Sequence, residues 1–193
     1  MPITNMSINK LFLYKARDAN IIAILCRGLK RLNWQLVLWN LDTDTFTEGQ
    51  WLKLKYMNGT YAAISPDGKY FAYHYHLFSG NPYQCHGVVS KLPNFTAEYF
   101  TPRFSGEWES IGFDTDGNIA FNTYEERQLI KKTDVDLHIV PYEKHIHSGY
   151  IDTTIWIDSR GRQIENKDGV LYADGVVLYD ARDNTFENKA SVS

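Results

Sequence analysis

Short runs of apolar residues recur along the whole chain and are separated by polar turns. The clearest pair lies at 61–65 (Tyr-Ala-Ala-Ile-Ser) and 69–73 (Lys-Tyr-Phe-Ala-Tyr), on either side of a Pro-Asp-Gly turn at 66–68. An Asp-Gly pair suits a tight hairpin because glycine adopts a positive φ without steric cost. Residues 61–73 are therefore predicted to form a β-hairpin.

This pattern returns at a fixed spacing. Asp18, Asp67 and Asp116 are each 49 residues from the next (67 − 18 = 116 − 67 = 49), and Phe46 and Phe95 have the same separation. A fixed period of about 20–50 residues is typical of repeat architectures. The chain is therefore predicted to be built from copies of one unit.

Aligned on this period, the chain divides into four units at 8–56, 57–105, 106–150 and 151–193. The fourth unit is shorter and more irregular, as expected of a terminal repeat. In the third unit, Val135, Leu137 and Ile139 alternate with polar residues, which predicts a half-buried strand. The expected strands are 11–16, 21–26, 34–40, 46–55, 60–65, 69–76, 84–91, 95–101, 109–114, 118–124, 133–140, 144–150, 153–158, 176–180 and a last one from 186 onward.

Four units of four antiparallel strands describe a single all-β domain, a β-propeller with four blades. Aromatic residues make up 15% of the chain and favour strands over helices. The N-terminal segment 5–10 is expected to close the ring by pairing with the last blade, which would remove exposed sheet edges.

The nine residues at 65–73, Ser-Pro-Asp-Gly-Lys-Tyr-Phe-Ala-Tyr, resemble the repeat of TolB-like and related β-propellers. Residues 114–121 echo the same motif, whereas 18–20 lack its glycine and 159–161 lack its Asp-Gly pair. The resemblance implies a propeller fold. It implies no catalytic residue, because the motif is a hairpin signature.

Length and charge limit the classes of partner. A chain of 193 residues fits one domain with a sizeable core. Its net charge of −3, with acidic and basic residues mixed, disfavours binding to nucleic acid. The longest apolar stretch, 21–26, is far shorter than the roughly 20 residues that cross a bilayer, so no membrane role is expected.

Two cysteines, Cys26 and Cys85, are too few for a disulfide framework. Free thiols are the expectation, and the N-terminus has no basic segment followed by an apolar one, as a secretory signal would. A cytoplasmic protein is therefore expected.

Histidines offer the only candidate site chemistry. His74 and His76 lie two apart in a predicted strand and so share a face, and His86 follows in the next strand. Together they could form a zinc site. The simpler interpretation is that His74 and His76 are surface residues that alternate with buried Tyr73 and Tyr75. A second pair, His145 and His147 near His138, is expected to be exposed.

The carboxylates of the turns have a structural explanation, because aspartate hydrogen-bonds to nearby backbone groups. Alternatively, Asp67, Asp114, Asp116 and Asp158 could line one rim and bind a cation or act as acid and base. The chain contains no Gly-x-Ser-x-Gly motif and no glycine-rich phosphate loop. No catalytic residue is therefore predicted.

These observations favour a non-enzymatic propeller without a cofactor, which binds a protein partner through loops at the ends of its blades. The expected loops are 27–33, 77–83 and 125–132. The alternative is a propeller that binds a small ligand or sugar, or a metal-dependent hydrolase, with its site in the central channel or on the rim. Metal content and a screen of hydrolase substrates would distinguish the two.

Overall fold

The computed structural model describes residues 10–28, 33–54, 56–57, 59–77, 84–101, 111–121, 130–141, 148–182 and 184. Within these ranges the chain forms strands β1 to β17, one short 3-10 helix (η1) and no α-helix. The prediction of an all-β protein is confirmed. None of the described residues belongs to a helix that is long and apolar enough to cross a membrane.

Sheet A is a four-stranded antiparallel meander in the order β1-β2-β3-β4. Its strands agree closely with the four predicted for the first unit, and a bulge interrupts the pairing of β3 with β4 between Gln35 and Val37. Both faces of the sheet are buried along β1, β2 and β3, which explains the continuous apolar runs in these strands, whereas β4 is mostly exposed. The strands are β1 (Lys10–Lys15), β2 (Ile21–Arg27), β3 (Asn33–Asn40) and β4 (Thr45–Lys53).

Sheet B follows the order β12-β9-β8-β7-β5, and β6 also pairs with β7. The predicted strand at 60–65 is wrong in part, because 59–61 form η1 and only 63–64 form a strand. Gly59 lies against the ring of Phe12, and a Cβ at this position would come within 2.6 Å of that ring. The elements are β5 (Tyr56–Met57), η1 (Gly59–Tyr61), β6 (Ala63–Ile64), β7 (Tyr70–Leu77), β8 (Gln84–Lys91), β9 (Ala97–Phe100) and β12 (Ile130–Lys131).

Sheet C contains β10 (Ile111–Phe113), β11 (Ile119–Phe121) and β13 (Ile139–Pro141). The predicted strand at 133–140 is wrong over most of its length, because only its end joins β13, which runs parallel to β11. The hydroxyl of Tyr99 forms backbone hydrogen bonds with 135–137 that a neighbouring strand would otherwise form. It accepts a hydrogen bond from the Leu137 amide (2.9 Å) and donates to the Val135 carbonyl (2.9 Å). Val135 and Leu137 are nevertheless half-buried, as their alternation indicated.

Sheet D is an antiparallel meander of β14 (Ile155–Ile157), β15 (Gln163–Lys167), β16 (Val170–Ala173) and β17 (Val176–Asp180). Strands β14 and β17 lie within or coincide with predicted strands (153–158 and 176–180), whereas β15 and β16 are not predicted from the sequence. One Asp-Gly turn joins β15 to β16 and a second joins β16 to β17. All four turn residues have positive φ: Asp168 (52°), Gly169 (82°), Asp174 (48°) and Gly175 (81°). The strand predicted from 186 onward lies outside the described residues.

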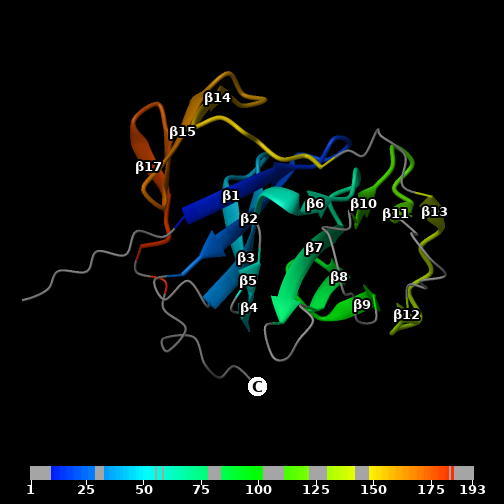
Figure 1. The fold of residues 1–193 in the computed structure, drawn as a ribbon. Coiled ribbons are helices and arrows are strands. Elements are labelled where there is room, and N and C mark those ends of the chain that lie inside the picture. The colour runs from blue at the N-terminus through cyan, green and yellow to red at the C-terminus, as the bar shows by residue number, and fades with distance from the viewer. Residues whose placement is uncertain are drawn as a thin grey trace, which may run out of the picture.

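The four sheets pack face to face in the order D, A, B, C, which Figure 1 shows from left to right. Alternate side chains of β1 pack into the two interfaces that sheet A forms with sheets B and D. Phe12 and Tyr14 pack toward sheet B, whereas Leu11 and Leu13 pack toward sheet D. A third apolar cluster joins sheet B to sheet C. Among the described residues no buried apolar cluster joins sheet C to sheet D, so a closed ring of four blades remains a prediction.

The chain reaches sheet D from sheet C by passing the inner edges of sheets B and A. The segment 148–151 hydrogen-bonds to β6 through the Ser148 carbonyl (3.2 Å) and to β1 through the Gly149 carbonyl (2.7 Å) and the Ile151 amide (2.9 Å). Figure 1 shows this crossing as the yellow trace that runs to β14. The predicted outer strand at 144–150 is therefore wrong in its described part, and residues 144–147 lie outside the described ranges. The N-terminal segment expected to close the ring also lies outside them, apart from Lys10.

An ion-pair network fastens sheet D to sheet A. The guanidinium of Arg162 donates two hydrogen bonds to Asp44, in the turn between β3 and β4 (2.6 and 2.9 Å), and one to Asp158 (2.8 Å). Arg160 donates a further bond to Asp44 (2.6 Å). The hydrogen bonds from Arg162, above all, hold the pKa of the Asp44 carboxyl below its ordinary value of 3.8.

Replacement of Arg162 by methionine is expected to lower the free energy of unfolding by about 2 kcal/mol at neutral pH, because Asp158 loses its ion-pair partner and Asp44 keeps only Arg160. A carboxyl whose pKa is lowered in the folded state stabilises the protein above its unfolded pKa and loses that contribution as the pH falls. The difference between wild type and Arg162→Met should therefore shrink below pH 3.8. Urea denaturation at neutral pH and at about pH 3 measures both values.

Arg182→Met provides the matched control, because Arg182 pairs with Asp180 in the same sheet but its side chain is 55% exposed. Its loss should cost less than about 1 kcal/mol. Equal effects of the two substitutions would contradict the role given to Arg162.

Candidate functional site

His74 and His76 lie on the face of β7 that is turned toward sheet C. Their partners across the sheet are Gly87 for His74 and Cys85 for His76. Directly opposite residues of an antiparallel pair have side chains on the same face. The Nε2 atom of His76 lies 3.9 Å from the Sγ atom of Cys85.

His74 is buried, with 3% of its surface exposed. Its Nε2 atom accepts a hydrogen bond from the Ile111 amide of β10 (3.1 Å). Burial lowers the pKa of His74 to about 4, so the ring is neutral at pH 7 and ties sheet B to sheet C. The prediction that His74 is a surface residue is therefore wrong, because sheets A and C cover both faces of sheet B.

His86 lies on the other face of sheet B, opposite Tyr75. Its ring stacks on Tyr75 and on Phe100 (centroids 5.0 and 5.6 Å apart), and its Nδ1 atom lies 2.9 Å from the Thr101 carbonyl. The structure thus brings His74 and His76 to one face and places His86 on the opposite one. The described residues contain no group of three or more histidine, cysteine, aspartate or glutamate side chains that could hold a metal ion.

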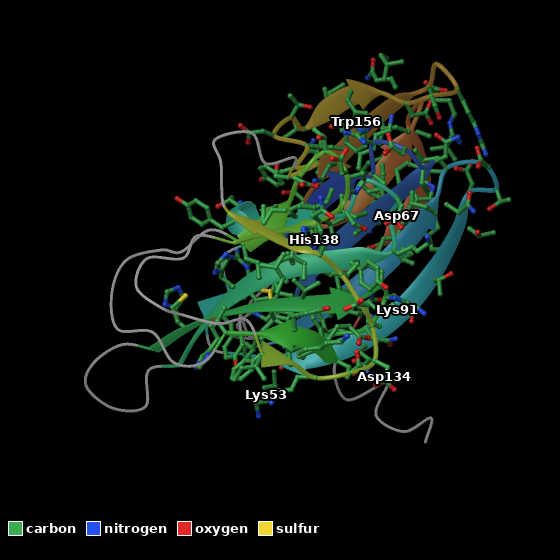
Figure 2. All side chains as sticks on the ribbon, turned by 90° about the vertical axis from the view of Figure 1, so that its right-hand side faces the viewer. Lys53, Asp67, Lys91, Asp134, His138 and Trp156 are labelled. Carbon is green, nitrogen blue, oxygen red and sulfur yellow. The ribbon has the colours of Figure 1, made fainter. Side chains whose placement is uncertain are left out.

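The remaining histidines are placed only in part. His138 is exposed on the segment that leads into β13, where Figure 2 labels it. His145 and His147 lie outside the described residues.

The aspartates of the turns act on the backbone. Asp114 accepts hydrogen bonds from the amides of Asp116 and Asn118 (both 2.8 Å). Asp158 repeats this with the amides of Arg160 (2.9 Å) and Arg162 (3.0 Å). These carboxylates close local turns, which is the structural role that the sequence favoured for them.

Ser65 makes the corresponding turn of sheet B. Its hydroxyl accepts hydrogen bonds from the amides of Lys69 (3.1 Å) and Tyr70 (2.9 Å). Asp67, two residues on, accepts a hydrogen bond from this hydroxyl (2.6 Å). Figure 2 shows Asp67 at the same end of sheet B as Lys91.

The recurring element is therefore a serine or aspartate followed three residues later by glycine. Gly68, Gly117 and Gly161 all have positive φ (73°, 85° and 78°). The turn at 158–161 belongs to this set, although it lacks the Asp-Gly pair. Alignment on Asp67 and Asp116 conceals this match, because the shared residue lies two positions earlier, at Ser65 and Asp114.

Sheet D has one covered face and one uncovered face. Trp156 and Ile164 lie opposite each other on the face that packs against sheet A. Figure 2 labels Trp156. The uncovered face, here called the outer face of sheet D, carries one row of side chains across all four strands. Its members in strand order are Ile155, Glu165, Tyr172 and Val177, with Ile157 beside the row.

This outer face exposes several apolar side chains to solvent, next to the polar Gln163, Glu165 and Lys167 of β15. Ile155, Ile157 and Val177 are 51%, 63% and 53% exposed. Glu165 lies between them and forms no ion pair with any residue in the described ranges. Exposed apolar side chains that gather on one face are typical of interaction surfaces. The three predicted binding loops cannot be compared with it, because 29–32, 78–83 and 125–129 lie outside the described residues.

Comparison with protein families, with curated proteins and with solved structures finds no match to this chain. The resemblance of residues 65–73 to TolB-like repeats therefore remains a prediction.

Proposed function

We propose that this protein is an interaction module that binds a β-sheet of a partner protein on the outer face of sheet D. The observation that carries the proposal is the exposure of Ile155, Ile157 and Val177 on one sheet face. In the same chain, strands β1, β2 and β3 of sheet A bury both of their faces against neighbouring sheets.

The order of packing supports a sheet as the occupant. Sheets D, A, B and C pack face to face in that order, and the outer face of sheet D is the next position in the stack. On this proposal the described sheets form a propeller-type arc that is open beside sheet D. A partner that continues the stack would bury apolar surface at roughly 25 cal/mol per Å².

Charge defines the partner further. Glu165 lies in the middle of the apolar row, between Ile155 and Tyr172. Burial of this carboxylate without a partner would be unfavourable. The complementary sheet is therefore apolar and places a lysine or arginine opposite Glu165. Binding through the loops at 27–33, 77–83 and 125–132 stays a separate prediction, because most of these residues lie outside the described ranges.

The substitution Ile157→Glu tests the proposal. Ile157 is 63% exposed, so the variant should fold like the wild type. The new glutamate is expected to weaken binding at least about tenfold. It would remove the apolar contact of Ile157 and place a charge against the apolar surface of the partner. Affinity capture identifies the partner, and calorimetry with both purified proteins measures the dissociation constant.

Tyr61→Glu is the matched control, because Tyr61 is an apolar residue of similar exposure (54%) on η1. It should bind like the wild type. A partner that binds Ile157→Glu and wild type equally would overturn the proposal. Sedimentation gives a further outcome: self-association that Ile157→Glu abolishes would assign the face to a second copy of this chain and overturn the assignment to a different protein.

A further inference from the structure

In sheets A, B and C, the first strand makes hydrogen bonds along the edge that points away from the rest of its sheet. For β1 and β6 the partner is the extended segment 148–151. For β10 it is His74, whose Nε2 atom accepts a hydrogen bond from the Ile111 amide (3.1 Å). The bonds to 148–151 are made by the Lys15 amide (2.7 Å), the Leu13 carbonyl (2.9 Å) and the Ile64 amide (3.2 Å).

Strand β14, the first strand of sheet D, is the exception. The pairs on either side of it are hydrogen-bonded, because the Asn166 amide donates to the Thr154 carbonyl (2.7 Å) and the Asp158 amide to the Arg162 carbonyl (3.0 Å). Bonded and non-bonded pairs alternate along an antiparallel ladder. The amides and carbonyls of residues 155 and 157 therefore point away from β15. In the part of the chain that the structure describes, β14 pairs with β15 alone and these groups have no partner.

The sequence of β14 does not protect this edge. Unpaired edges invite the addition of another strand, and proteins usually guard them with charged residues, proline or bulges. Apart from its length of three residues, β14 has none of these features, since it reads Ile-Trp-Ile in regular register with β15. Strand β17, at the other edge of the sheet, pairs with β16 through a bulge and ends in Asp180. The edge of β14 is therefore the less guarded of the two.

We propose that a partner protein adds an extended segment to sheet D as a new strand along β14. The inference rests on the proposed function and deepens it, because Ile155 and Ile157 belong both to this edge and to the outer face of sheet D. Main-chain hydrogen bonds to an added strand supply affinity, and its alternate side chains supply specificity. Segment 148–151 binds the edges of β1 and β6 through its backbone in the same manner.

The exposed side chains define the residues of the added strand. Ile157 is 63% exposed, so the residue opposite it is apolar. Glu165 lies directly across from Ile155 on the outer face and forms no ion pair within the described ranges. A lysine or arginine opposite Ile155 can extend over that side chain toward the Glu165 carboxylate. The segment is therefore extended and alternates apolar and basic residues on the side of the outer face.

The probe is the peptide acetyl-Thr-Val-Thr-Lys-Thr-Val-Thr-amide, added to the uniformly ¹⁵N-labelled protein. At saturation it should shift the amide resonances of Ile155 and Ile157 most strongly and slow their hydrogen exchange at least about tenfold. A counterpart with N-methyl groups on lysine and on both valines keeps every side chain but loses the donors that face β14. It should bind at least about tenfold more weakly.

Two substitutions of Ile157 separate backbone from side-chain recognition. Ile157→Pro removes the outward amide and leaves the bonds to β15, because proline is tolerated at an edge strand whose N–H faces solvent. It should weaken peptide binding at least about tenfold. Ile157→Ala keeps the amide and removes apolar contact, so it should weaken binding clearly less than Ile157→Pro. Circular dichroism confirms the folding of both variants, and the N-methylated peptide keeps the test decisive if Ile157→Pro does not fold.

Three results would overturn strand addition: no shift of the two amides with the peptide, equal binding of the N-methylated peptide, or equal effects of Ile157→Pro and Ile157→Ala. Slow exchange of both amides without peptide would also overturn it, because the edge would then be occupied by this chain or by a second copy. Failure of the proposed function is distinguishable, since it appears as equal binding of the partner by Ile157→Glu and wild type, whatever the peptide does.

Discussion

Replacement of Trp39 by alanine is expected to lower the free energy of unfolding by about 3–5 kcal/mol, as for other fully buried aromatic residues. Trp39 is wholly buried between sheets A and D. Its ring stacks on Phe46 (centroids 5.5 Å apart), and Phe46 stacks on Tyr179 of sheet D (5.0 Å). Its Nε1 atom donates a hydrogen bond to Asp44 (3.2 Å), the carboxylate that Arg162 also binds. The substitution would therefore remove apolar contact and one member of the network that joins the two sheets.

Urea denaturation, followed by circular dichroism, measures this loss. Tyr61→Ala serves as the control, because that side chain is 54% exposed and should change the stability by less than about 1 kcal/mol. A loss below about 1 kcal/mol for Trp39→Ala would show that sheet D does not pack on sheet A as described.

Replacement of Gly149 by alanine is expected to cost about 2–4 kcal/mol, from overpacking together with an unfavourable φ. Gly149 has a φ of 67° and lies where the chain crosses β1 and β6. A Cβ at this position would come within 2.5 Å of the Lys15 carbonyl oxygen and 2.7 Å of Ile64. The backbone atom cannot move aside without breaking the hydrogen bond from the Lys15 amide to Gly149.

Gly161→Ala separates the two causes. Gly161 has a similar φ of 78°, but a Cβ there would meet no atom within 4 Å. Its replacement should cost only about 1 kcal/mol, the strain of a left-handed conformation. Similar losses for both variants, measured by thermal or urea unfolding, would show that 148–151 do not run along β1 and β6.

Much of the strand pattern could be predicted from the sequence. Sheet A was predicted nearly strand for strand, because its apolar runs are long and its turns are polar. The turn at 66–68 was recognisable for the same reason. The turn is set locally, by a glycine with positive φ. The apolar runs of β1, β2 and β3 reflect burial of both faces of these strands, which shows directly in the sequence.

The wrong predictions concern segments whose structure depends on residues far away in the sequence. The alternation at 133–140 correctly indicated that Val135 and Leu137 are half-buried, but Ile139 is exposed. Tyr99, more than thirty positions earlier, supplies the hydrogen bonds that a strand partner would have made. The path of 148–151 depends on the inner edges of β1 and β6. Strands β15 and β16 are a different case, because the Asp-Gly turns at 168–169 and 174–175 are a local signal from which these strands could have been predicted.

The candidate metal ligands show the same limit. Spacing by two correctly placed His74 and His76 on one face of a strand. Whether Cys85 or His86 joins them depends on the register of β7 with β8, because a shift of one residue reverses the face of every side chain. The loop between these strands gave no indication of that register. The structure pairs His76 with Cys85 and places His86 on the opposite face from His74 and His76.

The central claim is that sheet D packs on sheet A by one face and leaves the other face uncovered. Nuclear Overhauser contacts between methyl groups of the labelled protein test it most directly. The account predicts contacts of Ile164 and Leu171 with Ile22 and Ile24, all within one buried cluster, and none between Ile155 or Ile157 and the Ile119 of sheet C. Contacts from Ile155 or Ile157 to Ile119, together with loss of those to Ile22 and Ile24, would contradict it.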